Sequence, residues 1–234
     1  MNNCFILHHL GLGDHIICNG LVREVLKKYD TLYFPVKHHN LKTVEKMFSD
    51  ISNKIIFLPV ENDAEMIQSF YPIRFNIREI VKLGIFYETN FIKKGENFCE
   101  SFYRNADIPY EKRWDSFRYQ RNIEGERLIS KTKIQDDYIF VHDDVSRNLN
   151  IDKSFLPNIK TYRPSHGLAE KANTTIFDYV PILENSKEIH CMDSSFAAMI
   201  DHIPSLKSKK KYIHRYVRAG SFNPKYENNW RIIE

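Results

Sequence analysis

Two short polar turns, each between an apolar run and a helix-like segment, constrain the fold of this chain more than any other feature. The first turn, Gly-Leu-Gly-Asp at 11–14, follows the apolar run 4–10, and the second, Asp-Ser-Ser-Phe at 193–196, follows the apolar run 189–192. Such junctions are typical of α/β proteins, in which a buried strand ends in a loop that begins a helix. Because anions and ligands bind at these helix N-termini, one turn in each half predicts two α/β halves that face a shared cleft.

Apolar runs and helix-like patterns alternate along most of the chain. We expect strands at 4–10, 31–36, 54–60, 137–141, 189–192 and 211–216, and helices at 15–29, 41–48, 63–70, 96–104, 124–131 and 195–203. A further helix is capped by Thr174 or Thr175 and is kinked or restarted by Pro181. The repeated strand–helix order favours parallel sheets. We place the two lobes at 1–130 and 131–234.

The composition is that of a globular protein with a substantial core. Of the 234 residues, 42% are hydrophobic, including 16 Phe and 13 Tyr, which suffices for one large α/β domain or two small ones. No apolar stretch approaches the roughly 20 residues that span a bilayer, and no signal peptide is recognisable. Cys4, Cys18, Cys99 and Cys191 lack C-x-x-C spacing. We therefore expect reduced core thiols in a cytoplasmic protein rather than disulfides or a zinc site.

The first polar turn carries a carboxylate with two interpretations. Gly11 and Gly13 let the backbone turn sharply and approach a ligand, and Asp14 stands at or near the start of the next helix. Asp14 is then either a capping residue or a general base that accepts a proton from an attacking hydroxyl. The turn is not a dinucleotide fingerprint, because Ile16 occupies the position of the third glycine, and it lacks the Gly-Lys-Ser/Thr end of a P-loop.

The second polar turn offers groups that suit a phosphate. Asp193 precedes the hydroxyls of Ser194 and Ser195, and Phe196 begins the apolar part of the helix. Hydroxyls and unpaired backbone N–H groups at a helix start form either an ordinary cap or a phosphate cradle without lysine. We keep both interpretations.

A third polar cluster follows the strand expected at 137–141. His142 is a candidate for phosphate binding or acid–base work, and Arg147 is a candidate for bidentate pairing with a pyrophosphate. The alternative is a polar turn with a local Asp–Arg pair. No D-x-D pattern occurs in the chain, so we expect no metal site.

Basic and aromatic residues gather in two further stretches. Residues 205–218 contain several Lys and Arg and no acid, which suits phosphates or an anionic membrane surface, and equally a solvated loop followed by a basic edge strand. Aromatics interleave with Lys and Arg at 98–121, but no known nucleic-acid-binding motif accompanies them, so we expect no nucleic-acid partner. Within that stretch, 107–114 is either an acceptor-facing loop or the crossover between the halves.

These residues resemble GT-B glycosyltransferases, most closely the heptosyltransferase-like group of glycosyltransferase family 9. In that family the first strand ends in a Gly-Asp turn before a helix that carries an arginine, and here Gly13, Asp14 and Arg23 match. The family's second half carries an Asp-Thr-Gly type turn that contacts the donor's phosphates, and 193–195 looks like its counterpart. The resemblance implies an α/β fold of two Rossmann-like lobes, of compact GT-B type, with a cleft between them. The Ser-Ser-Phe end is also similar to fucosyltransferases that use GDP-sugars.

The resemblance implies a glycosyltransferase that moves a sugar from a nucleotide-sugar donor to a hydroxyl of a glycan or lipid-linked acceptor. It implies that Asp14 is the base, and we expect neither a metal nor a cofactor beyond the co-substrate. The first lobe is expected to hold the acceptor and the second the donor, with a peripheral contact to an anionic membrane. The donor-binding candidates are Gly11, Gly13, His142, Arg147, Asp193, Ser194, Ser195 and Phe196, and the acceptor-binding candidates are Arg23, Tyr103, Arg113 and Trp114. The alternative is a non-catalytic nucleotide- or glycan-binding protein on the same fold.

Overall fold

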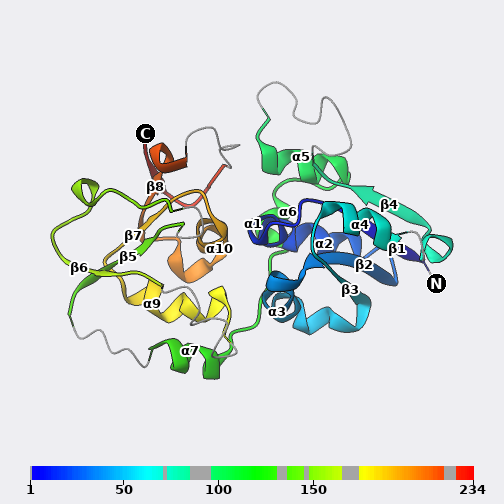
Figure 1. Cartoon of the computed structure of the whole chain (residues 1–234), viewed down its shortest axis with the longest axis horizontal. Coiled ribbons are helices and arrows are strands. Elements are labelled where there is room, and N and C mark those ends of the chain that lie inside the picture. The colour runs from blue at the N-terminus through cyan, green and yellow to red at the C-terminus, as the bar shows by residue number, and fades with distance from the viewer. Residues whose placement is uncertain are drawn as a thin grey trace. The chain divides into compact units, whose positions relative to one another are not determined.

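Two separate sheets of parallel strands form the framework of the chain in a computed structural model (Figure 1). The structure describes residues 2–70, 73–84, 96–130, 136–144, 148–164, 174–218 and 225–234. Two compact units contain one sheet each, Met1–Gln120 and Arg121–Glu234. The division falls earlier in the chain than the boundary expected from sequence.

The first unit contains four strands in the order β3-β2-β1-β4. The strands are β1 (Asn3–Leu7), β2 (Thr31–Lys37), β3 (Ile55–Val60) and β4 (Glu79–Lys82), and every pair is parallel. The helices are α1 (Leu12–Ile17), α2 (Asn19–Val25), α3 (His38–Met47), α4 (Asp63–Phe70), α5 (Phe98–Asn105) and α6 (Lys112–Asp115), with 3₁₀ turns η1 (Ser49–Lys54) and η2 (Arg74–Asn76). The alternation predicted from hydrophobic periodicity is thus confirmed for this half, and β4 is an additional strand.

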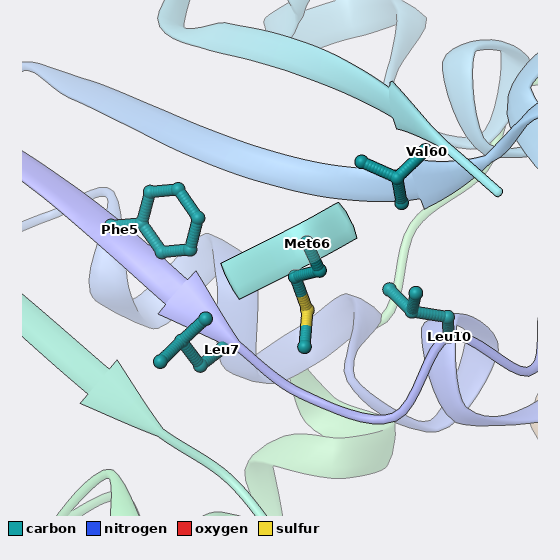
Figure 2. Close-up of a cluster of buried hydrophobic side chains, with 5 residues drawn as sticks. All are labelled: Phe5, Leu7, Leu10, Val60 and Met66. Carbon is teal, nitrogen blue, oxygen red and sulfur yellow. The ribbon is translucent and has the colours of Figure 1, made fainter. Parts of the chain in front are cut away.

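The core of the first unit lies on both faces of β1, as its continuous apolar run predicts. Phe5 and Leu7 of β1 pack with Leu10, Val60 and Met66, so that α4 covers one face of the sheet (Figure 2). Burial of each such side chain stabilises the fold by roughly 1.5–3 kcal/mol. All four cysteines of the chain are buried thiols, as expected.

The long helix expected at 15–29 is two helices. α1 ends at Ile17, Cys18 caps it with a ψ of 0°, and α2 begins at Asn19. The Asn19 side chain is buried and is taken up by the segment after α6: its Nδ2 donates to the Arg118 carbonyl, and its Oδ1 accepts from the Arg118 N–H, both at 3.0 Å. The break between α1 and α2 thus coincides with a buried polar anchor in an otherwise apolar helix face.

Gly20 allows α6 to approach α2 closely. A Cβ at Gly20 would lie 2.0 Å from the Lys112 carbonyl oxygen. The stretch 107–114, interpreted from sequence as an acceptor loop or a crossover, therefore includes a helix that packs inside the first unit.

Replacing Gly20 with Ala should destabilise the first unit by about 1–3 kcal/mol, because backbone atoms must move to make room. Urea unfolding followed by the fluorescence of Trp114, which lies in α6, measures the loss. The control Lys28→Ala changes an exposed side chain just after α2 and should shift stability by less than about 0.5 kcal/mol. Equal stability of Gly20→Ala and its parent would contradict the close approach of the two helices.

The second unit contains five parallel strands in the order β6-β5-β7-β8-β9. They are β5 (Tyr138–His142), β6 (Lys160–Tyr162), β7 (Glu188–Cys191), β8 (Lys210–His214) and β9 (Trp230–Ile233). The helical elements are α7 (Ile123–Ser130), η5 (Lys153–Phe155), η6 (Ile176–Tyr179), α9 (Val180–Asn185), α10 (Ser195–His202), η7 (Pro204–Leu206) and η8 (Arg215–Arg218). α7 belongs to this unit because it packs on η6 and α9. Thr175 caps η6, and α9 restarts with Pro181 in its first turn, as predicted.

A buried carboxylate, that of Asp201, holds the segment that leads into β9, the last strand of the sheet. Asp201 of α10 accepts hydrogen bonds from the backbone N–H groups of Glu227 and Asn228 and from the indole N–H of Trp230, at 3.0–3.2 Å. The Trp230 packing expected from sequence is therefore accompanied by a strand that the sequence did not reveal.

The basic stretch 205–218 is less available to an anionic surface than its composition suggests. Lys211 is buried, and its ammonium donates to backbone carbonyls at 2.6 and 2.9 Å. Lys209 donates to the Ser186 carbonyl, and Lys210 pairs with Glu188. The Lys211 side chain is therefore structural rather than part of an exposed basic surface. Across the described ranges, no helix is both long and apolar enough to cross a bilayer.

Candidate functional site

The strand order of the second sheet changes direction between β5 and β7. From β5 the chain goes to β6 on one side, and β7 lies on the other side. In open α/β sheets, ligands bind at the carboxyl ends of the strands next to such a switch point. His142 ends β5 and is in register with Cys191 at the end of β7, which the turn 193–195 follows. The structure therefore brings two of the sequence-predicted clusters to one place.

Ser194 and His142 meet at this switch point. Ser194 is the N-cap of α10, and its Oγ lies 3.4 Å from the Ala197 N–H and 3.1 Å from the His142 Nδ1. Ser194, Ser195 and His142 are each half-buried rather than enclosed. A hydroxyl pair, an imidazole and a helix N-terminus together form a group of donors that suits an anionic ligand.

The two other residues of the second turn, Asp193 and Phe196, are buried. Phe196 is only 5% exposed, and its ring lies 4.4 Å from the His142 ring and 5.5 Å from the Phe140 ring, centroid to centroid. Asp193 is 4% exposed. The Phe196 ring, in the first turn of α10, thus packs into the core and orients His142, and the donor contact predicted for this residue stays a prediction.

An ion pair between a buried carboxylate and a partly exposed arginine begins at the residue after His142. The Asp143 carboxylate is 7% exposed, accepts from the Ile151 N–H at 2.8 Å, and pairs with the guanidinium of Arg163. Sequence reasoning named no role for Arg163, because only the pairing of β6 with β5 reveals where it lies. Arg147, the predicted pyrophosphate ligand, lies outside the described residues.

The first sheet has its own switch point, between β1 and β4. Gly11 is the N-cap of α1, and Asp14 is half-buried in the first turn, with Gly13 before it. A Cβ at Gly11 would lie 2.5 Å from Asp14 Oδ2, so the carboxylate folds back over the Gly11 backbone. The loop is held from α3 by Asn40, whose Nδ2 donates to the Leu10 carbonyl at 3.1 Å. Asp14 thus has a defined place at the carboxyl edge of this sheet.

The histidines near this edge pack against aromatic rings. His8 stacks on Phe34 with ring centroids 4.7 Å apart, and His15 meets His8 edge-on at 4.5 Å. His9 packs against Phe98. Burial lowers the pKa of His8 to about 4 and that of His9 to about 4, and it lowers the pKa of His15 as well.

The acceptor-binding residues predicted in the first unit are mostly structural. The Tyr103 and Arg113 side chains are fully buried: Tyr103 donates to the Ile17 carbonyl at 2.7 Å, and Arg113 donates to the Tyr110 hydroxyl at 2.7 Å. An acceptor contact by these two residues is therefore wrong, because neither reaches the surface. Among the four candidates, Trp114 retains a half-exposed ring, which lies over the Arg113 guanidinium.

Arg23 is likewise engaged inside the first unit. Its guanidinium pairs with Asp50 at 2.8 and 2.9 Å, and its Nε donates to Asn19 Oδ1 at 3.1 Å. The side chain is 11% exposed. It ties α2 to η1, which is a structural role at the position where the sequence suggested an acceptor contact.

Comparisons with known proteins find similarity in structure alone. No protein-family model matches the sequence, and no curated protein matches it. The structure is similar to the Escherichia coli ADP-heptose lipopolysaccharide heptosyltransferase II, with a TM-score of 0.57 and 9% identity over 100% of this chain and 90% of that chain. It also matches a glycosyltransferase family 9 protein of Veillonella parvula (TM-score 0.48, 10% identity, 99% of this chain and 85% of that chain) and the E. coli heptosyltransferase WaaC with ADP (TM-score 0.45, 9% identity, 100% and 90%). With its two parallel α/β sheets, the chain has the fold of the heptosyltransferase-like GT-B glycosyltransferases, as its two polar turns predicted.

Proposed function

We propose that this protein is a glycosyltransferase that moves a sugar from a nucleotide-sugar donor to a hydroxyl of a glycan or lipid-linked acceptor. The observation that carries the proposal is the meeting of His142, Ser194 and the N-terminus of α10 at the switch point of the second sheet. Such an arrangement suits the diphosphate of a nucleotide sugar. The fold it shares with a heptosyltransferase whose substrate is ADP-heptose is consistent with that donor class.

In the proposed reaction, the acceptor hydroxyl attacks the anomeric carbon of the donor sugar. The bond from that carbon to the phosphate oxygen breaks, and the nucleoside diphosphate leaves with the bonding electrons. Asp14 takes the proton of the hydroxyl, as a general base at the edge of the first sheet. The hydroxyls of Ser194 and Ser195, His142 and the N–H groups of α10 stabilise the charge on the leaving diphosphate, without a metal ion.

The remaining parts of the proposal concern the acceptor and the compartment. The half-exposed ring of Trp114 is the candidate acceptor contact that the first unit retains, and a flat aromatic face suits the apolar side of a sugar ring. The buried thiols are consistent with a reducing, cytoplasmic setting. Lys207 and its neighbours leave a smaller basic surface for a peripheral membrane contact than the sequence suggested.

A set of ADP-, GDP-, UDP- and CDP-sugars tests the donor assignment by thermal shift. One nucleotide class should raise the melting temperature, because a ligand that binds only the folded state stabilises it. Ser194→Ala should weaken the affinity for that nucleoside diphosphate by about 10- to 100-fold, the value of hydrogen bonds to a charged group. The control Ser205→Ala removes a surface hydroxyl that donates to Glu184 and should bind as the parent does.

Two outcomes would contradict the proposal. No stabilisation by any of the nucleotide sugars would remove the donor class altogether. Stabilisation without transfer to any hydroxyl would favour a non-catalytic nucleotide-binding protein.

A further inference from the structure

Arg163 lies at the same edge of the second sheet as His142 and Ser194. It is the first residue after β6, and β6 pairs in parallel with β5. Parallel strands place their carboxyl ends at one edge. Arg163 Nη1 donates to Asp143 Oδ2, and Asp143 directly follows His142. The strand pairing thus fixes a positive charge at the carboxyl end of β6, next to β5.

In the ion pair the Asp143 carboxylate is buried and fixed, while the Arg163 side chain is partly exposed. Asp143 is 7% exposed, and its second oxygen accepts from the Ile151 N–H at 2.8 Å, so the carboxylate cannot swing away. The Arg163 side chain is 34% exposed. Within the described ranges Arg163 pairs with Asp143, and a guanidinium carries five N–H donors in a planar fork. The arginine is therefore oriented by one partner and still presents donors to a ligand.

A cation would strengthen diphosphate binding by the remaining groups at this edge. Ser194, Ser195 and the α10 N-terminus provide hydrogen bonds and a partial positive charge, and the turn contains no lysine. Arginine is the side chain best suited to a phosphate, because its N–H groups match two oxygens at once. A carboxylate behind the guanidinium holds it in place and leaves less ordering for the ligand to impose.

Resting on the function proposed above, we propose that Arg163, positioned by Asp143, binds the diphosphate of the nucleotide-sugar donor and stabilises the leaving group. Arg163 is then a binding residue and Asp143 a positioning residue. The polar surface of the donor site extends along three adjacent strand ends, those of β6, β5 and β7.

The test compares a nucleoside diphosphate with its nucleoside in Arg163→Gln. Calorimetry first identifies which of ADP, GDP, UDP and CDP the parent protein binds. Arg163→Gln should then bind that diphosphate about 10- to 100-fold more weakly, while its affinity for the matching nucleoside stays the same. A purely structural role would lower both affinities together. The matched control is Lys160→Gln. Lys160 begins β6, at the end opposite to Arg163, and pairs with Asp136, so its replacement should leave both affinities unchanged.

A second variant covers the case in which Arg163→Gln fails to fold. The unpaired buried Asp143 carboxylate would be the cause, and the double variant Asp143→Asn/Arg163→Gln removes that charge while its side-chain oxygen still accepts from Ile151. The double variant should lose diphosphate affinity as the single one does. Asp143→Asn alone should weaken diphosphate binding less, since the guanidinium remains but is no longer held.

The outcomes separate this inference from the proposed function. If the parent protein binds none of the four diphosphates, both fail. If the parent binds one of them and the double variant retains the parent's ratio of diphosphate to nucleoside affinity, the assignment of Arg163 is overturned and the proposed function stands.

Discussion

Replacing Asp14 with Asn should reduce sugar transfer by about 10²- to 10⁴-fold, the usual contribution of a general base. An amide of the same shape cannot take the proton of the acceptor hydroxyl. The affinity for the nucleoside diphosphate should stay the same, because its proposed ligands belong to the second unit. Steady-state transfer rates with the donor identified by thermal shift, together with calorimetry on the diphosphate, measure the two effects.

The local structure makes this substitution a clean test. Asn fits where Asp14 folds back over Gly11, so the entry into α1 is retained. The lost attraction between a carboxylate in the first turn and the helix dipole costs at most about 1 kcal/mol. A loss of turnover with unchanged folding therefore points to proton transfer.

Two companion variants sharpen the interpretation. Gly11→Ala keeps the carboxylate but places a Cβ 2.5 Å from Asp14 Oδ2, so it should displace the base and also lower the rate. Asp63→Asn is the matched control, since Asp63 likewise stands in the first turn of a helix that follows a strand of the same sheet. Full activity of Asp14→Asn, or an equal loss in Asp63→Asn, would show that Asp14 is not the base.

Hydrophobic periodicity predicted the buried central strands and the edge strand β3, and it missed the edge strands β4, β6 and β9. The central strands β1 and β5 are covered on both faces, so nearly every position is apolar and the run is visible in the sequence. β4, β6 and β9 are short, and β6 reads Lys-Thr-Tyr with no buried position. Such a strand forms because the neighbouring strand has an unpaired edge. Which strand is its neighbour depends on the tertiary fold and cannot be seen in the local sequence.

The site residues that directly follow an apolar strand could be predicted from the sequence. The residues whose place depends on packing or on strand pairing with a distant segment could not. Ser194 and His142 each follow an apolar run, so the sequence alone placed them at one edge. Arg113 and Tyr103 are amphipathic and read equally well as surface or core residues, and the packing around α6 decides for the core. Arg163 acquires its place through the pairing of β6 with β5, which no local pattern encodes.

Lowering the pH from 7 to 5 should destabilise the second unit through a pair of buried histidines. His190 Nδ1 lies 3.0 Å from His214 Nε2, so one imidazole donates and the other accepts, and both cannot be protonated in this arrangement. Both side chains are at most 2% exposed. Burial, together with the neighbouring His190, lowers the pKa of His214 to about 4, and burial lowers the pKa of His190 although Glu188 opposes it.

The sign follows from proton uptake on unfolding. An unfolded histidine has a pKa near 6.5, so between that value and about 4 the unfolded chain binds protons that the folded chain excludes. Stability contributed by neutral His214 is therefore present above pH 6.5 and is lost as the pH falls. For His214 alone the loss between pH 7 and 5 is about 2 kcal/mol, and His190 adds to it in the same direction.

The two tryptophans of the chain report on the two units separately, because Trp114 lies in the first and Trp230 in the second. In a Trp114→Phe background, urea unfolding followed by Trp230 should show a midpoint that falls steeply from pH 7 to 5. His190→Phe/His214→Phe keeps the stacking of position 190 on Tyr212 and replaces both hydrogen-bonding partners together, which is nearly neutral at pH 7.

The double histidine variant should flatten the acid dependence that Trp230 reports. A Trp230→Phe background, read through Trp114, provides the internal control: His8 and His15 keep the first unit acid-sensitive there, with or without the substitutions in the second unit. If the urea midpoint reported by Trp230 falls equally in the parent and in the double variant, the acid sensitivity arises from other groups. The His190–His214 hydrogen bond would then not contribute to the pH dependence of stability.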